Sequence, residues 1–203
     1  MPSRRDAERA LEAVVDFPEP EVGLEQYLTP PSVAASIAHH AALTGDLERR
    51  IVDLGTGTGM LAIAAALYEA PAVTGLEVDR GALRVAHRNA RRLEVTAEWV
   101  QGDVRSLPLS LESATVLANP PWGAQHGNRK ADRDFLEAAA SIGAVSYTVH
   151  NAGSLSTVEG VTERLGGTVT DALETTLPID HRFDFHTAER TDQPAEVIRI
   201  EWD

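Results

Sequence analysis

The chain has 203 residues, 43% of them hydrophobic, which is enough for one well-buried domain. It has no cysteine, which excludes disulfides, thiol nucleophiles and zinc sites built on its own cysteines. It has neither an apolar run of about 18 residues nor a signal-peptide core, so we expect a soluble, cytoplasmic protein without a membrane span. The seven histidines show no metal-ligand spacing, and we predict no metal site.

The net charge of -13 arises from 31 acidic and 18 basic residues, and Lys130 is the only lysine. Such an excess of negative charge disfavours contact with nucleic-acid phosphates at low salt. Acidic residues spread along the chain, with arginine in place of lysine, are typical of a salt-adapted cytosolic protein, as in a halophilic archaeon; an ordinary acidic enzyme is the alternative. In molar salt the Debye length is only about 3 Å, so this charge does not exclude an RNA substrate.

The first 45 residues predict two helices joined by a loop. Residues 6–15 have the apolar spacing of an amphipathic helix, and the prolines that follow residue 17 end it. Pro30 and Pro31 stand where a second helix over residues 32–43 begins, and Gly45 closes it. The face of the first helix consists of Ala7, Leu11, Val14 and Val15.

From residue 50 onward, short β-rich runs alternate with helical stretches, which is the pattern of a parallel sheet covered by helices on both faces. The last two strands follow each other directly and predict an antiparallel hairpin. We therefore expect one α/β domain over residues 1–203, with N-terminal helices and a covering loop in 1–45 and a seven-stranded core in 46–203. The predicted strands are 51–54, 73–76, 98–101, 115–118, 144–149, 168–176 and 195–201, and the predicted helices are 60–68, 80–93, 132–142 and 156–165.

Three successive strand ends carry candidate binding residues. Asp53-Leu54-Gly55-Thr56-Gly57-Thr58-Gly59 forms a glycine-rich turn that is neither G-x-G-x-x-G nor a triphosphate loop. Glu77 can accept hydrogen bonds from both hydroxyls of a ribose, and Asp103 can accept from an adenine amine. Tight packing, a surface carboxylate and a helix cap are the alternatives. Together the three ends predict one crevice at the carboxyl edge of the sheet.

The fourth strand ends in Asn119-Pro120-Pro121-Trp122-Gly123. The prolines fix φ and remove two backbone donors, so the carbonyls of Asn119 and Pro120 and the Asn119 side-chain oxygen can accept both hydrogens of a planar NH2 group. Trp122 offers a stacking face, worth roughly 1–3 kcal/mol for a nucleobase. A proline-terminated strand with a core tryptophan is the alternative.

Taken together, these motifs resemble the Rossmann-like class I S-adenosylmethionine-dependent methyltransferases that modify amino groups. Leu24-Glu25-Gln26-Tyr27-x-Thr29, Pro120-Pro121-Trp122-Gly123, Tyr147-Thr148-Val149-His150 and Phe183-x-Phe185-His186 look more specifically like the methyltransferase-like protein five family, and this likeness covers nearly the whole chain. That family makes N6-methyladenosine in small-subunit ribosomal RNA. Glu77 replaces the aspartate common in the family and Trp122 its usual phenylalanine, which changes the reach of both side chains.

The resemblance implies an enzyme with S-adenosylmethionine as cofactor and ribosomal RNA as substrate. It implies catalytic roles for Asn119, Pro120, Pro121 and Trp122. A small zinc-binding activator subunit is expected to add a strand to the sheet edge near Trp99, giving a heterodimer. The implied cofactor-binding residues are Gln26, Tyr27, Thr29, Asp53, Gly55, Thr56, Gly57, Gly59, Met60, Glu77, Val78, Gly102, Asp103, Val104 and Asn119, and the substrate-binding residues are Trp122, Gly123, Asn128, Arg129 and Lys130.

Three functions remain open besides the expected one. The same corner can hold a glutamine amide of a release factor or the amino group of guanine in RNA, and the chain can also be an inactive cofactor-binding scaffold. Arginines recur every four residues along the predicted helix 80–93, either as a track for phosphates or as a solvated face.

Overall fold

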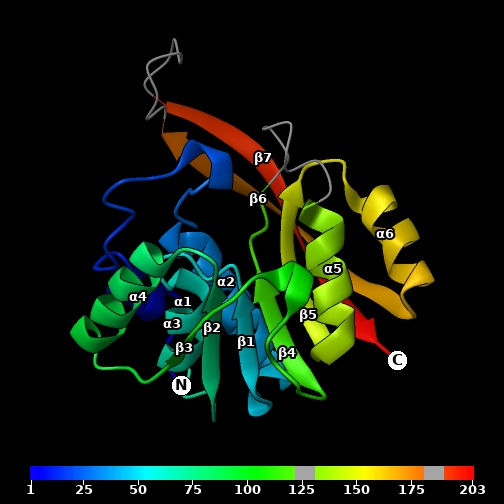
Figure 1. Ribbon diagram of the computed structural model, residues 1–203, viewed down its shortest axis with the longest axis horizontal. Helices are drawn as coiled ribbons and strands as arrows, with labels where there is room; N and C mark the ends of the chain where they lie inside the picture. The colour runs from blue at the N-terminus through cyan, green and yellow to red at the C-terminus, as the bar shows by residue number, and fades with distance from the viewer. Residues whose placement is uncertain (122–130, 181–189) are drawn as a thin grey trace.

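The computed structural model describes residues 1–121, 131–180 and 190–203. These residues form a seven-stranded sheet with the order β3-β2-β1-β4-β5-β7-β6 (Figure 1). Strands β1 to β5 are parallel, and β7 pairs antiparallel with both β5 and β6, which confirms the predicted sheet and its hairpin. The strands are β1 (Ile51–Leu54), β2 (Val73–Glu77), β3 (Glu98–Gln101), β4 (Ala114–Ala118), β5 (Gly143–Asn151), β6 (Gly167–Asp180) and β7 (Arg190–Trp202).

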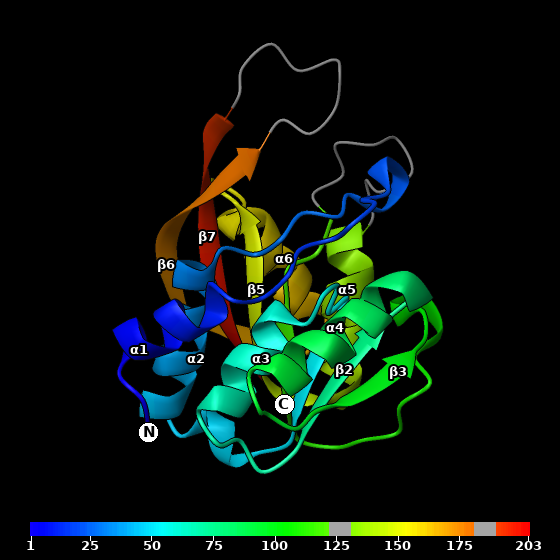
Figure 2. The same ribbon diagram turned by 90° about the vertical axis from the view of Figure 1, so that its left-hand side faces the viewer.

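Helices cover both faces of this sheet (Figures 1 and 2). One apolar core lies under α1, α2 and α3, and the other lies under α5 and α6. Because successive strand residues point to opposite faces, Leu117 enters the first core while Val116 and Ala118 enter the second. The helices are α1 (Arg4–Leu11), α2 (Pro31–Leu43), α3 (Met60–Leu67), α4 (Arg80–Arg92), α5 (Ala131–Ile142) and α6 (Leu155–Arg164), with 3-10 turns η1 (Val22–Leu24), η2 (Asp46–Glu48) and η3 (Val104–Ser106).

The first helix is shorter than the sequence predicts. α1 ends at Leu11 instead of residue 15, and Val15 is 43% exposed instead of buried with the apolar face. The reason is a tertiary contact, because the backbone of Val15 pairs with the side chain of Asn89 on α4 through two hydrogen bonds of 3.0 and 2.9 Å. Val14 still enters the core, from beyond the helix.

The C-terminal hairpin is longer than predicted. β6 continues to Asp180 and β7 begins at Arg190, although prolines at 178 and 194 favour shorter strands. Both prolines lie opposite partners in the β6·β7 ladder, because an outer hairpin tolerates a missing donor. The predicted helix at 32–43 is confirmed, with Pro31 as its first residue and Gly45, at φ +79°, after its end.

Within the described ranges, no helix is both long and apolar enough to cross a membrane. The same residues contain no group of three or more histidine, aspartate or glutamate side chains placed to hold a metal ion.

Candidate active site

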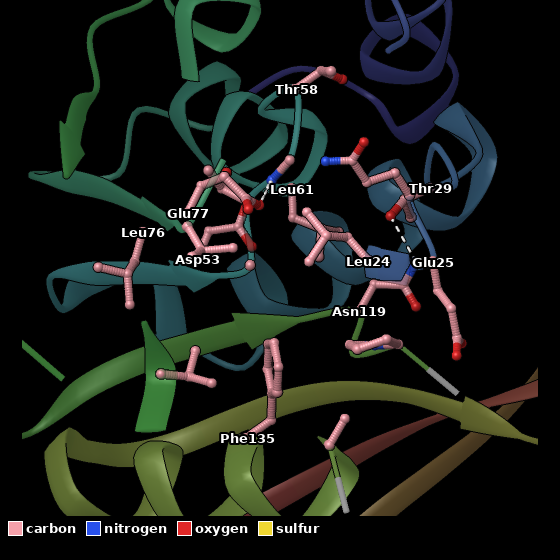
Figure 3. A pocket seen from close by; sticks show the side chains of 18 of the residues that line it. Leu24, Glu25, Thr29, Asp53, Thr58, Leu61, Leu76, Glu77, Asn119 and Phe135 are labelled. Atoms are coloured by element: carbon pink, nitrogen blue, oxygen red, sulfur yellow. Dashed lines mark hydrogen bonds between the residues drawn. The ribbon is translucent and has the colours of Figure 1, made fainter. Parts of the chain in front are cut away.

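A pocket opens at the carboxyl ends of β1, β2 and β4, and residues of the segment that joins α1 to α2 line it as well (Figure 3). All the predicted cofactor-binding residues line it except Gly59. Pro121 also lines the pocket, and Pro120 does not. The predicted residues Trp122, Gly123, Asn128, Arg129 and Lys130 lie outside the described residues, as does the motif at 183–186.

Gly57 and Gly59 of the glycine-rich turn lie in different surroundings. At Gly57 the φ angle is +56°, and an added Cβ would come within 2.7 Å of the Phe17 ring, which lies against this part of the turn. Gly59, at φ +94°, precedes α3, and its α-carbon faces Trp99 and Ala86. Gly59 therefore lies on the side of the turn that packs against the core and does not contribute to the pocket wall.

Asp53, at the floor of the pocket, is buried and only half satisfied. Its Oδ2 accepts hydrogen bonds from the Thr56 hydroxyl (2.5 Å) and the Ala62 amide (2.9 Å), whereas Oδ1 is buried with no partner. Burial raises the pKa of Asp53 to about 7, against the opposing effect of those hydrogen bonds. The free oxygen is an acceptor that a ligand can use.

Glu77, at the end of β2, is only 8% exposed. One carboxylate oxygen accepts from the Gly57 amide at 2.9 Å and the other from the Asp79 amide at 3.0 Å. Burial raises the pKa of Glu77, and the backbone hydrogen bonds oppose that rise. These bonds fix the carboxylate in the pocket, and each oxygen keeps a second lone pair for a ligand hydroxyl.

Asp103 is paired within the chain. Its carboxylate forms a bidentate contact with the guanidinium of Arg105, with N–O distances of 3.0 and 2.5 Å, and this hydrogen bonding lowers its pKa. Arg105 lies on the pocket wall and was not predicted, because a basic residue in a turn has no distinctive pattern. A ligand group that donates to Asp103 must share its carboxylate with Arg105.

Asn119 ends β4 and is oriented by a residue far away in the chain. Its side-chain nitrogen donates to the Thr29 hydroxyl at 3.0 Å, as the dashed line in Figure 3 shows. This bond leaves Oδ1 as the free end of the amide, buried and without a partner. The structure thus connects the loop before α2 to the corner after β4, and it leaves one buried acceptor of that corner without a protein partner.

His150, from the Tyr-Thr-Val-His motif, is fully buried and is not part of the pocket wall. Its Nε2 lies 2.8 Å from the Thr148 hydroxyl. His150 is therefore a core residue and does not contact the pocket.

Several wall residues were not predicted as binding residues, although Leu24, Glu25 and Thr58 lie within the motifs of the sequence. Most are apolar side chains whose strand or helix position alone does not reveal which cavity they face. Phe17 precedes two prolines and is separated from the turn it contacts by 40 positions, so no local signal predicts that contact. The missed residues are Phe17, Leu24, Glu25, Leu28, Thr58, Leu61, Leu76, Arg105, Ala131, Asp134 and Phe135.

The pocket wall carries an excess of negative charge. Its acidic residues are Glu25, Asp53, Glu77, Asp103 and Asp134, and its only basic residue among those described is Arg105, which Asp103 already neutralises. Buried carboxylates with free acceptors suit a ligand that carries positive charge and hydroxyl or amine donors.

Comparison with known proteins shows the family to which a chain with this pocket belongs. The sequence model of the family described as "Methyltransferase small domain" matches residues 35–159, more than half of the chain. The rRNA N(6)-adenosine-methyltransferase Mettl5 of Drosophila melanogaster is 34% identical, over 97% of this chain and 95% of that protein. The chain belongs to the methyltransferase-like protein five family.

Two further proteins resemble this chain over nearly its whole length. The uncharacterized protein MJ0284 of Methanocaldococcus jannaschii is 31% identical over 99% of this chain and 95% of its own length. The crystal structure of a putative RNA methyltransferase, PH1948 from Pyrococcus horikoshii, superposes with a TM-score of 0.89 at 31% identity, covering 100% of this chain and 98% of that one.

As a member of the methyltransferase-like protein five family, the protein is an S-adenosylmethionine-dependent N-methyltransferase of class I fold. The pocket fits this cofactor chemically. Acidic side chains line the pocket and suit a ligand that carries a sulfonium and an ammonium group, and the unpartnered Asp53 oxygen offers such a ligand an acceptor.

Proposed function

We propose that this protein methylates N6 of adenine in small-subunit ribosomal RNA. The observation that carries the proposal is the Asn119 amide, which Thr29 holds so that its buried oxygen has no partner. An acceptor in this state fits a planar NH2 group, because a buried polar atom left without a hydrogen bond is destabilising until a ligand satisfies it. The names of the full-length relatives, which are ribosomal RNA adenosine methyltransferases, support RNA as the substrate.

The acceptor corner works by positioning. Asn119 Oδ1 accepts one N6 hydrogen and the Pro120 carbonyl accepts the other, which directs the nitrogen lone pair toward the methyl donor. When bound, S-adenosylmethionine would supply a methyl group on a positively charged sulfur; transfer to N6 would leave a neutral thioether, and the lost N6 proton would pass to solvent. Pro121 keeps the corner rigid, and Trp122, with Gly123 beside it, stacks on the base after it leaves the helix.

The remaining wall residues bind the cofactor in this proposal. Glu77 accepts from the ribose hydroxyls, Asp103 from the adenine amine, and Asp53 stabilises positive charge at the methionine end. Gln26 and Thr29 cover that end from the N-terminal loop, and their placement in the pocket supports the division into a covering segment 1–45 and a core 46–203 within one domain. Asn128, Arg129 and Lys130 contact the RNA.

Asn119→Ala tests the assignment. The protein, purified with whatever co-purifies, is incubated with labelled S-adenosylmethionine and small-subunit ribosomal RNA, tRNA or a release factor. We expect N6-methyladenosine in the ribosomal RNA, and we expect Asn119→Ala to lower kcat by about 100-fold or more while the cofactor Kd stays within about threefold.

Other outcomes identify the alternatives. Full methylation by the Asn119→Ala protein would remove Asn119 from the mechanism. Label in a glutamine of a release factor, or in guanine, would replace the substrate assignment. Cofactor binding without transfer to any acceptor would leave the protein as a scaffold.

We also propose a small zinc-binding activator subunit that adds a strand to β3 in the cytoplasm. Among the described residues β3 pairs with β2 alone, and its other edge is free to accept a strand. The indole of Trp99 packs on Gly75 at this edge, and its Nε1 is buried without a partner. A protein purified from its native host as a single chain, with no second polypeptide in its mass spectrum, would contradict this heterodimer.

A further inference from the structure

The outward face of α4 is an arginine surface, formed by Arg80, Arg84, Arg88, Arg91 and Arg92. All five side chains are exposed, as is His87 between them. α4 contains no acidic residue, and its buried face is made of alanine, leucine, valine and Asn89. Figure 2 shows α4 on the near flank of the molecule, beside β2 and β3.

This surface is unusual for so acidic a protein. The chain carries 31 acidic residues and only 18 basic ones, yet five of those 18 lie on this 13-residue helix. Acidic residues are abundant elsewhere in the sequence, so their absence from α4 is not a consequence of composition.

Most arginines of the surface lack partners. In the described part of the chain, Arg80, Arg84, Arg88 and Arg91 form no ion pair or side-chain hydrogen bond, and Arg92 donates one hydrogen bond to the Ala13 carbonyl at 3.2 Å. Four arginines elsewhere in the described residues are neutralised locally, whereas Arg5, Arg9 and Arg164 are not. Arg49 and Arg199 pair with Asp46, Arg105 with Asp103, and Arg133 with Glu137.

The spacing works against the helix itself. Arg80, Arg84, Arg88 and Arg92 follow one another at intervals of four residues, which places like charges next to each other on one face. Arg80 also lies at the positive end of the helix dipole. Neither arrangement favours folding of the helix, and both concentrate positive charge where a polyanion would use it.

The arginine surface begins at the pocket rim. Val78, which lines the pocket and is 47% exposed, precedes Arg80 by two residues. A rise of about 1.5 Å per residue carries the surface roughly 18 Å away from the rim. An RNA strand that crosses the pocket rim from the catalytic corner toward α4 would meet these guanidinium groups one after another.

We propose that this arginine surface binds the phosphate backbone of the ribosomal RNA next to the methylated adenine. The proposal rests on the proposed function and adds a path for the RNA away from the catalytic corner. Unpaired guanidinium groups bind phosphates in a bidentate manner, and they supply the positive charge that the acidic remainder of the chain lacks.

The test compares two triple variants with the same change in net charge. Arg84→Gln, Arg88→Gln and Arg91→Gln together remove the middle of the surface, and Arg5→Gln, Arg9→Gln and Arg164→Gln together remove three exposed arginines from α1 and α6. Each protein, with any co-purifying partner, is titrated with a ribosomal RNA fragment at several KCl concentrations at which circular dichroism shows it folded.

For the α4 variant we expect a KM for RNA raised about tenfold or more and a salt dependence of log K shallower by roughly 2, since each lost phosphate contact lowers the slope by about 0.7 to 0.9. The cofactor Kd should stay within twofold, and the α1 and α6 variant should behave as the native protein does.

The two proposals fail in different ways. If both triple variants have the native RNA affinity and salt slope while ribosomal RNA is still methylated, the arginine surface does not bind RNA and the proposed function stands. If both triple variants weaken RNA binding equally, the effect comes from net charge, and the proposed role of the arginine surface is again wrong. Loss of a co-purifying protein in the α4 variant alone, with unchanged RNA binding by the protein that remains, would assign the surface to that partner. No RNA methylation by the native protein would instead refute the proposed function.

Discussion

Asp53 shows how a single residue of this site opposes folding. Its carboxyl is buried, one oxygen receives two hydrogen bonds and the other receives none. Burying an ionised group without full compensation is destabilising, so the side chain keeps its proton to higher pH. A residue placed in this way contributes little to the fold, and its value lies in the ligand that completes its environment.

A pH dependence of stability follows from the raised pKa of Asp53, about 7 instead of the ordinary 3.8. Below pH 3.8 the group is protonated in both the folded and the unfolded chain and has no effect. As the pH rises toward 7 the unfolded chain releases this proton and the folded protein retains it, so the cofactor-free protein loses stability. Asp53→Asn, which keeps an acceptor for Thr56 and Ala62, should remove that loss.

Thermal unfolding of the cofactor-free protein measures the loss of stability that Asp53 causes as the pH rises. We expect the Tm of Asp53→Asn relative to the native protein to increase between about pH 5 and pH 8, and its cofactor affinity to be weaker at pH 8. A Tm difference that is the same at both pH values would mean that Asp53 titrates normally in the folded state.

At the level of residues, sequence predicted much of the pocket wall. Asp53, Glu77, Asp103 and Asn119 were predictable because parallel strands end at a common edge of the sheet, which brings their last residues together. Phe17 and Phe135 were not, because their places depend on how distant segments pack. The pairing of Asp103 with Arg105 was equally invisible, since it depends on side-chain geometry within a turn.

At the level of elements, hydrogen bonds to α4 connect the segment after α1 with the glycine-rich turn. Asn89, on the buried face of α4, accepts from the Val15 amide and donates to the carbonyls of Val15 and Thr58, with all three distances between 2.9 and 3.0 Å. Two residues further along, Phe17 packs on Gly57 and lines the pocket. Asn89 therefore holds the backbone that carries Phe17 to the pocket wall.

A double-mutant cycle tests this linkage. Phe17→Ala should weaken S-adenosylmethionine binding by about tenfold, equivalent to about 1.4 kcal/mol, because an aromatic contact of the pocket wall is lost. Asn89→Ala should weaken it by a smaller factor, and the double variant should match Phe17→Ala, since Asn89 acts through Phe17.

Isothermal titration calorimetry of the four proteins provides the affinities. Phe17→Tyr, which keeps the ring, is the matched control and should bind as the native protein does. Additive losses in the double variant would show that Asn89 supports the pocket by another route, such as its bond to Thr58.

The element boundaries that sequence predicted wrongly share one cause. Local periodicity continues the first helix to Val15, and the competing bonds to Asn89 come from a residue 74 positions away. The hairpin likewise extends past the prolines at 178 and 194 because its two strands pair with each other over their whole described length. Tertiary pairing decided both boundaries, and no local pattern encodes it.

At the scale of the whole molecule, the fold class was predictable and the strand order was not. Alternation of β-rich and helical stretches is sufficient for a parallel sheet with covered faces, and two adjacent strands without a helix between them are sufficient for a hairpin. β7 lies between β5 and β6, and this position depends on which strand edges pair in the folded chain. The salt-adapted origin inferred from the acidic composition stays a prediction.

The position of β7 has a consequence for how the protein is made. β7 follows every other strand in the chain, yet it lies inside the sheet with β5 on one side and β6 on the other. Until residues 190–202 have been synthesised, β5 has an open edge and β6 has no partner in the sheet. The nascent chain on the ribosome therefore exposes two unpaired strands, the surfaces from which aggregation begins, and this half of the sheet closes in a single late event.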